Sequence, residues 1–190
     1  MPELSVLIPT VGGRDSLLVQ VQEAIRREHP TAELLVIRGH SWGMGLNLLA
    51  AVAQGEYWSC CCDDTIPQPG WFEAGRAMLD SGSEPASRYF NVDGTPLHAV
   101  DEMPHGERLP WCRSFLLTPH IYSEVGPFID ATWYSDWDYS ERLIAAGYPI
   151  LACDGFSFTH LDGDRAWNTP AEDARQRSEY EASHQRQGIA

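Results

Sequence analysis

The chain has 190 residues, 43% of them hydrophobic, and a formal net charge of −14 at pH 7. This length suits one domain with a sizeable core, and the strong negative charge argues against nucleic acid or anionic lipid as partners. The five cysteines include three consecutive ones at 60–62, a poor disulfide framework that predicts reduced core thiols in a cytoplasmic protein.

Strands and helices alternate over the first third of the chain. In order, the pattern predicts a strand at 4–9, a helix at 15–28 with Asp15 as its N-cap, a strand at 33–37, a helix at 46–54 and a strand at 57–62. The run at 33–37 is apolar without alternation, which predicts a strand buried on both faces. Repeated strand–helix units predict right-handed crossovers and a doubly wound α/β sheet. In such sheets, ligands bind outside the carboxyl ends of the strands.

Shorter elements are predicted for the rest of the chain. In order, these are a helix from Pro69 to about Leu79, a loop at 81–85, strands at 88–92 and 97–100 joined by an Asp93-Gly94 hairpin turn, a polar loop at 101–110, a strand at 111–117, a short helix capped by Thr118 and ending at Gly126, a helix at 136–146, and short strands at 150–153 and 156–160.

Residues 171–186 are charged and predict a peripheral helix. Neither a repeat nor a linker is visible, so we expect a single domain over 1–165 and a charged helical extension over 166–190. No apolar run approaches the roughly 20 residues of a membrane span, and the first residues lack the basic and then apolar pattern of a signal peptide.

Two adjacent carboxylates, Asp63 and Asp64, follow the third predicted strand. They stand where the ligand crevice of a doubly wound sheet is expected. Carboxylates in this position suit a divalent cation such as Mg²⁺ or Mn²⁺, which in turn binds phosphate oxygens. The alternative is a loop in which Asp63 forms an Asx turn and Asp64 is a solvent-facing charge.

Further motifs follow in a fixed order. The ordered set is Val6-Leu-Ile-Pro-Thr10, Asp63-Asp64, Pro67-x-Pro-Gly-Trp71, Val125-Gly-Pro-Phe-Ile-Asp130, Ser135-Asp-Trp-Asp-Tyr-Ser-Glu-Arg-Leu143, Ala146-Gly-Tyr-Pro-Ile150 and Phe158-Thr-His160. Over roughly residues 3–160 this set resembles the family 2 glycosyltransferases of the GT-A fold. The resemblance implies a mixed sheet with flanking helices. It also implies metal-dependent transfer of a sugar, with inversion, from a nucleotide diphosphate sugar to a hydroxyl of a glycan or protein. A UDP-sugar is the donor that the family uses most.

The resemblance implies a set of donor-binding residues. The family's first strand and the loop after it help to bind the nucleotide, and they correspond here to Pro9, Thr10 and Arg14, with Asp63 nearby. After the second strand many relatives carry an acidic residue that contacts the base, whereas this chain has Arg38. Arg38 either approaches a phosphate or is a surface residue of the loop.

A cation site follows from the same resemblance. Asp64 and His160 correspond to residues that bind Mn²⁺ or Mg²⁺ beside the diphosphate, although a lone histidine after an apolar strand is explained equally well as structural. The family's metal motif often reads Asp-x-Asp, and its first position here is Cys62, whose thiol is a poor ligand for Mg²⁺. This departure leaves open a degenerate module that binds a sugar nucleotide or a glycan without turnover.

The catalytic base of the family corresponds to Asp136, near the start of a predicted helix. A carboxylate there would accept the proton of the attacking hydroxyl. Trp111, Trp137 and Asp138 are candidates for acceptor binding. For the tryptophans the alternative is packing, and for Asp138 it is helix capping or an ion pair with Arg142, four residues on.

The remaining alternatives concern reaction class and assembly. A nucleotidyltransferase is the third hypothesis, because Thr10-Val-Gly-Gly-Arg14 faintly resembles a phosphate-holding loop. The later motifs favour sugar transfer. The acceptor site is expected to come from the loop at 101–113, from the C-terminal segment, or from another subunit of a homo-oligomer.

Overall fold

The computed structural model describes residues 1–10, 12–96, 114–132 and 134–161, together with 174–175, 177–178 and 180–181. Strands in these ranges are β1 (Leu4–Thr10), β2 (Glu33–Arg38), β3 (Tyr57–Cys60), β4 (Thr65–Pro67), β5 (Glu84–Phe90), β6 (Phe115–Leu117) and β7 (Ile150–His160). The helices are α1 (Asp15–Glu28), α2 (Trp42–Ala50), α3 (Trp71–Asp80), α4 (Pro119–Val125) and α5 (Ser135–Ala145).

The strands form two sheets. A four-stranded sheet has the order β2-β1-β3-β6, in which β1 is parallel to β2 and β3, and β6 is antiparallel to β3. A three-stranded sheet has the order β4-β7-β5. The predicted α/β fold with mixed sheets and flanking helices is therefore confirmed. Because β2 and β3 lie on opposite sides of β1, the chain reverses direction across the sheet at β1, which is where α/β sheets bind ligands.

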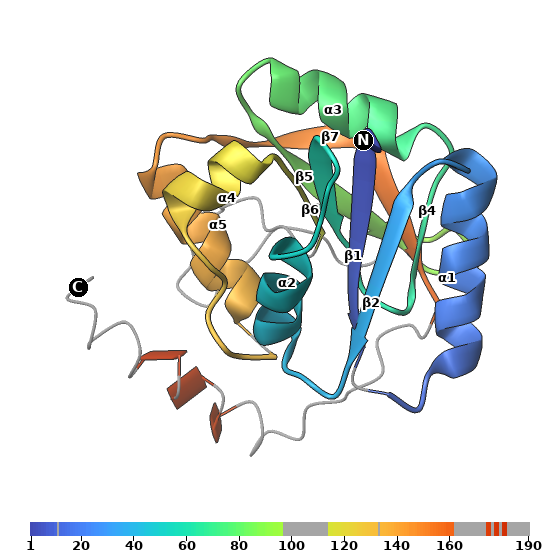
Figure 1. The fold of residues 1–190 in the computed structure, drawn as a ribbon, viewed down its shortest axis with the longest axis horizontal. Helices are drawn as coiled ribbons and strands as arrows, with labels where there is room; N and C mark the ends of the chain where they lie inside the picture. Colours follow the sequence, from blue (N-terminus) through green and yellow to red (C-terminus); the bar gives the residue numbers. More distant parts are fainter. Residues whose placement is uncertain are drawn as a thin grey trace.

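The helices cover these sheets in two groups (Figure 1). His29, which ends α1, makes edge contacts with Trp71 and Phe72 of α3, so these two helices share one side. Helices α2, α4 and α5 lie together on the left of the view. Both α1 and α2 begin at the lower end of β1 and β2, so their N-termini lie beside the carboxyl ends of these strands.

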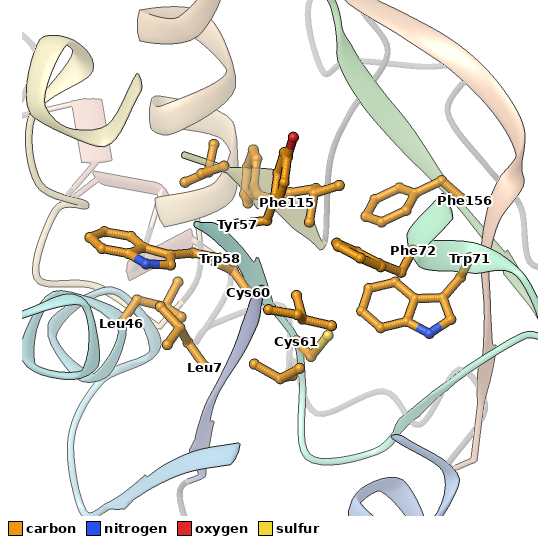
Figure 2. Close-up of a cluster of buried hydrophobic side chains, with 14 of the residues drawn as sticks. Leu7, Leu46, Tyr57, Trp58, Cys60, Cys61, Trp71, Phe72, Phe115 and Phe156 are labelled. Atoms are coloured by element: carbon orange, nitrogen blue, oxygen red, sulfur yellow. The ribbon is translucent and has the colours of Figure 1, made fainter. Parts of the chain in front are cut away.

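The core joins the two sheets through large aromatic side chains. Figure 2 shows Trp71 and Phe156 gathered on one side of Cys60 and Cys61, with Trp58 on the other. The Trp71 ring lies 6.1 Å from that of Phe156. Cys60 and Cys61 are fully buried free thiols, as predicted for core cysteines. Burial of this aromatic surface is the main favourable term in the stability of the fold.

The second strand and helix differ from expectation. Residues 33–38 are half-buried or exposed, whereas every residue of the central strand β1 is buried, because β2 is the edge strand of its sheet. Helix α2 begins at Trp42 and not at 46. Ser41 caps it by accepting a hydrogen bond from the Met44 N–H at 3.2 Å, and a Cβ at Gly43 would lie 1.9 Å from the Ile129 carbonyl oxygen. Gly43, one of the glycines that favoured a loop in the prediction, is thus required by close packing inside the helix.

The ends of several other helices and strands differ from the predicted ones. Arg14, not Asp15, is the N-cap of α1, and Asp15 is its first residue. β3 ends at Cys60, two residues early, and β5 already begins at Glu84 within the predicted loop. The two short strands predicted at 150–160 form one long strand, β7, because both of its ends pair with β5. The register shifts between them, where residues 153–156 of β7 bulge opposite the segment between Ala86 and Arg88.

Some predictions lie wholly or partly outside the described residues. Those are the strand at 97–100, the loop at 101–110, the first part of the strand at 111–117 and most of the extension at 166–190. The Asp93-Gly94 turn is present, with the Thr95 N–H donating to Asp93. Over the residues that are described, no helix is both long and apolar enough to cross a membrane.

Glu84 links the two sheets from inside the core. Its side chain is buried, and Oε1 accepts a hydrogen bond from the Leu116 N–H of β6 at 2.9 Å. Burial raises the pKa of the Glu84 carboxyl well above its ordinary value of 4.5. The carboxyl is therefore neutral in the folded chain over the mildly acidic range.

This neutral carboxyl makes stability depend on pH. The pKa of Glu84 is higher in the folded chain than the ordinary value of 4.5 that holds in the unfolded chain. The neutral carboxyl therefore makes its full contribution to folding stability below pH 4.5, and this contribution is lost as the pH rises toward the folded-state pKa. Glu84→Gln cannot ionise, so we expect it to gain stability over the natural chain by up to about 1.4 kcal/mol per pH unit in that interval. Urea unfolding at several pH values measures the difference, with Glu73→Gln, an exposed residue of α3, as the matched control. Equal pH dependence of Glu84→Gln and the natural chain would contradict this assignment.

Candidate functional site

The acidic pair predicted from the sequence lies just beyond the carboxyl end of β3. Asp63 and Asp64 are only 5% and 4% exposed, so the solvent-facing alternative for Asp64 is wrong. The hydroxyl of Thr10, at the end of the neighbouring β1, donates to Asp63 Oδ2. The Gly12 N–H in turn donates to the Thr10 oxygen at 3.1 Å, which orders the loop that follows β1.

Arg14 supplies the positive charge that this pair needs. Its Nη1 lies 2.5 Å from Asp64 Oδ2 and 3.2 Å from Asp63 Oδ1, and its side chain is only 16% exposed. Two adjacent buried carboxylates repel each other and lose hydration, so a guanidinium between them offsets much of both costs. The position of Arg14 at the N-cap of α1 aims its side chain from the end of β1 toward the end of β3.

His160 approaches the same carboxylate from the second sheet. Strand β4 follows Asp64 at once, and its first residue, Thr65, is paired with His160 of β7. The Leu161 N–H donates to the Asp64 carbonyl at 2.8 Å, which fixes the two strands together. His160 Nε2 consequently lies 3.6 Å from Asp64 Oδ2. Asp64 and His160, which the resemblance assigned to one site, thus lie close together, while β4, the strand that joins them, was not predicted.

Asp136 belongs to the same region of the molecule. The pKa of the Cys62 thiol is raised well above its ordinary value, first by burial and then by the negative charges of Asp64, Asp63 and, more weakly, Asp136. One thiol thus feels both the acidic pair and the predicted base, which stands in the first turn of α5. Carboxylates of both predicted groups therefore act on the same thiol, although they are more than 70 residues apart in the sequence.

Asn47 of α2 holds the segment that leads into α5. Its Nδ2 donates to the Phe128 carbonyl at 2.8 Å, while its Oδ1 accepts from the Phe128 N–H and the Tyr122 hydroxyl, both at 2.9 Å. Ser41 donates to Asp130 at 2.5 Å, and Ser135 donates to the Ile129 carbonyl. These hydrogen bonds set the start of α5, and they could not be predicted because each joins segments that are distant in the sequence or depends on a local backbone carbonyl.

Asp138 and Trp137 have structural surroundings. The Asp138 carboxylate is fully buried and lies 2.6 Å from Arg142 Nη2, which confirms the alternative of an i,i+4 ion pair. Arg142 also donates to the carbonyls of Val125 and Pro127, so this pair ties α5 to the end of α4. Asp138 is too deeply buried to meet an acceptor, and we assign it this structural role. The Trp137 ring packs edge-on against Tyr134 at 5.1 Å.

The remaining predicted donor residues lie at the same sheet edge. Pro9 is buried in β1 beneath α2, and a Cβ at Gly45 would lie 2.6 Å from the Pro9 Cβ, so Pro9 shapes the strand and does not face a ligand. Arg38 pairs with Asp15 at 2.5 Å, with both side chains about half or more exposed. The predicted acceptor residue Trp111 lies outside the described residues.

A divalent cation could be held by two of these side chains. Asp64 Oδ2 and His160 Nε2 face one another, and the buried Nδ1 of His160 has no hydrogen-bond partner among the described residues. A carboxylate and an imidazole suit Mn²⁺ or Mg²⁺ that also binds phosphate. Within the same described residues, no cluster of three or more His, Cys, Asp or Glu side chains could hold a metal. Asp64 and His160 therefore form a two-residue site within the described part of the chain, and substrate oxygens would be needed to complete it.

Comparisons with known proteins bear on the fold. No protein-family model matches the chain, and no curated protein matches it. Among the solved structures that match is the crystal structure of S. aureus TarS 1-349, with a TM-score of 0.61 and 10% sequence identity. The match covers 84% of this chain and 60% of the TarS chain, so this chain spans less than two thirds of that structure. TarS is a GT-A glycosyltransferase, and the likeness confirms the GT-A-type fold predicted here.

Loss of the Thr10 hydroxyl should leave Asp63 Oδ2 buried without this donor. We expect Thr10→Val to lower the free energy of unfolding by about 1–3 kcal/mol, the cost of an unsatisfied buried polar group. Thr10→Ser keeps the hydroxyl and should recover most of that loss. Urea unfolding at neutral pH measures both, and equal stabilities of the valine and serine variants would show that the bond to Asp63 contributes nothing.

Proposed function

We propose that this chain is a glycosyltransferase that uses a nucleotide diphosphate sugar, namely a UDP-sugar, as its donor. One observation carries the proposal. The Arg14–Asp63–Asp64–His160 cluster stands at the carboxyl ends of β1 and β3, where a GT-A-like sheet has its ligand crevice. The resemblance of the ordered sequence motifs to family 2 glycosyltransferases supports the same reading.

Donor binding is assigned to the residues around the acidic pair. Thr10 and Asp63 order the loop after β1, and Arg14 brings a guanidinium to the place where the diphosphate is expected. Asp64 and His160 are the proposed ligands of a divalent cation. Such a cation, when bound, supplies positive charge that stabilises the leaving nucleoside diphosphate. Arg38 and Asp15 form an exposed pair at the end of β2 and are candidates for contact with the rest of the nucleotide.

Asp136 is proposed as the general base. It projects from the first turn of α5, which the Asn47 and Ser135 contacts hold in place. A base on the face of the sugar opposite the diphosphate removes the acceptor's proton during direct displacement, which inverts the configuration. Trp137 beside it is proposed to contact a glycan or protein acceptor, because an indole packs well against the apolar face of a sugar.

Cys62 motivates one alternative. It replaces the first carboxylate of the usual metal motif with a thiol whose pKa is raised, so this position offers neither a charge nor a hard ligand. A chain of this fold that binds sugar nucleotides or glycans without turnover would carry such a replacement. The two readings differ in whether product forms, and the next experiments separate them.

Calorimetric titration with UDP-, GDP-, dTDP- and CDP-sugars tests the donor proposal. We expect one nucleotide sugar to bind in Mn²⁺ and to bind at least about tenfold more weakly in EDTA. Asp64→Asn should remove most of the Mn²⁺ effect. Folded protein that binds none of the four would contradict the proposed function in both its catalytic and its binding form.

Asp136→Asn tests the proposed base once a donor is known. We expect the rate of sugar transfer, or of donor hydrolysis, to fall by about a hundredfold or more while donor affinity is kept within about twofold. The matched control is Asp154→Asn. Asp154 lies on β7 in an exposed ion pair with Arg88 of β5, and its substitution should change neither quantity. Transfer by Asp136→Asn at near the natural rate would exclude this residue as the base.

A further inference from the structure

Two side chains approach the same carboxylate oxygen. Asp64 Oδ2 lies 2.5 Å from Arg14 Nη1 and 3.6 Å from His160 Nε2. The oxygen that would ligate a divalent cation together with His160 is therefore the same oxygen that now binds the guanidinium. A divalent cation and Arg14 both carry positive charge, so they repel each other, and contact of both with this oxygen at the same time is electrostatically unfavourable.

The charges around this oxygen are close to balance without any ligand. Asp63 and Asp64 contribute two negative charges and Arg14 contributes one positive charge, so the carboxylates of this largely buried pocket outnumber its guanidinium by one. A nucleoside diphosphate is itself an anion and is repelled by such a pocket. Positive charge must enter with it, or Arg14 must turn from the carboxylates toward the phosphates.

The loop that carries Arg14 leaves room for such a movement. Gly12 and Gly13 precede it with positive φ of 89° and 76°, and a Cβ built on either would meet nothing within 4 Å. The space beside these glycines is thus open, while hydrogen bonds from the Gly12 N–H to Thr10 and from the Leu17 N–H to the Arg14 carbonyl hold the backbone on either side. By contrast, β4 and β7 fix Asp64 and His160 through paired strands. Arg14 lies outside these paired strands, so its long side chain can turn away from Asp64 without breaking the pairing of β4 and β7.

We infer that Arg14 is a resident counter-ion that competes with a divalent cation for Asp64 Oδ2 and, once displaced, binds the diphosphate. The competition between Arg14 and a cation does not depend on the proposed function. The binding of the displaced Arg14 to a diphosphate rests on the proposed function. Metal alone binds weakly, because it must break the Arg14–Asp64 ion pair. Nucleotide and metal then bind cooperatively, because the diphosphate gives the released guanidinium a new anionic partner.

Titration of Mn²⁺ into nucleotide-free protein tests the competition. We expect Arg14→Met to bind Mn²⁺ about tenfold more tightly than the natural chain, since the competitor is gone. Arg26→Met, an exposed residue near the other end of α1, is the matched control and should bind as the natural chain does. Asp64→Asn should abolish binding with either residue at position 14, which would assign the signal to this site. Equal Mn²⁺ affinity in Arg14→Met and the natural chain would overturn the inference.

Arg14→Lys and thermal unfolding show whether a changed Mn²⁺ affinity of Arg14→Met comes from lost competition or from a folding defect. Lysine keeps the positive charge, so Arg14→Lys should keep Mn²⁺ affinity nearer to that of the natural chain than Arg14→Met does. If Arg14→Met is destabilised by its uncompensated carboxylates, Mn²⁺ should raise its Tm by more than it raises that of the natural chain. A smaller Mn²⁺-dependent rise in Tm would count against the competition.

UDP tests the second half of the inference. In the natural chain, saturating UDP should tighten Mn²⁺ binding by about tenfold, after correction for the UDP–Mn²⁺ complex in solution. In Arg14→Met this coupling should be several-fold smaller, because only the direct contact between phosphate oxygens and Mn²⁺ remains, while Arg26→Met should keep the coupling of the natural chain. Full coupling in Arg14→Met would contradict a role for the released guanidinium. Failure of UDP to bind any variant would remove the nucleotide part, and tighter Mn²⁺ binding by Arg14→Met would still establish the competition.

Discussion

Two adjacent carboxylates buried at the tip of a strand require positive charge beside them, and this constraint organises the chemistry of the molecule. Arg14 meets it from the start of α1, within 3.2 Å of Asp63 and 2.5 Å of Asp64. Thr10 binds Asp63 from the end of β1, and His160 approaches Asp64 from β7. Since these residues come from three separate strands and one helix start, the ion cluster also fixes how the two sheets meet at this edge.

Much of this arrangement was predictable from the sequence, because it follows from order along the chain. The alternation of strands and helices predicts parallel β1, β2 and β3, and parallel strands bring the residues after Thr10 and Cys62 to one edge. The pairing of Asp138 with Arg142 follows from helical spacing alone. The roles expected for Asp64, His160 and Asp136 came from resemblance to a family, and they stay proposals.

What the sequence could not predict depends on packing between distant segments. The position of β2 at the edge of its sheet depends on which strands pair. An apolar run such as that of β2 occurs in edge strands and in central strands, so it does not predict this position. The start of α2 at Trp42 depends on Gly43 lying against the Ile129 carbonyl, a contact invisible in the glycine itself. Arg14 as the partner of the acidic pair is likewise a tertiary contact, since about 50 residues separate it from Asp63. The short strand β4 lacks any period of its own and exists because β7 pairs with it.

A crystal structure with UDP and Mn²⁺ tests the central claim, that this cluster is the diphosphate site of a GT-A-like fold. The account predicts a diphosphate at the carboxyl ends of β1 and β3, with Mn²⁺ on Asp64 and His160 and with the Arg14 guanidinium turned from Asp64 to a phosphate oxygen. A nucleotide bound elsewhere on the chain, or a bound nucleotide beside an Arg14–Asp64 pair that is unchanged, would contradict it.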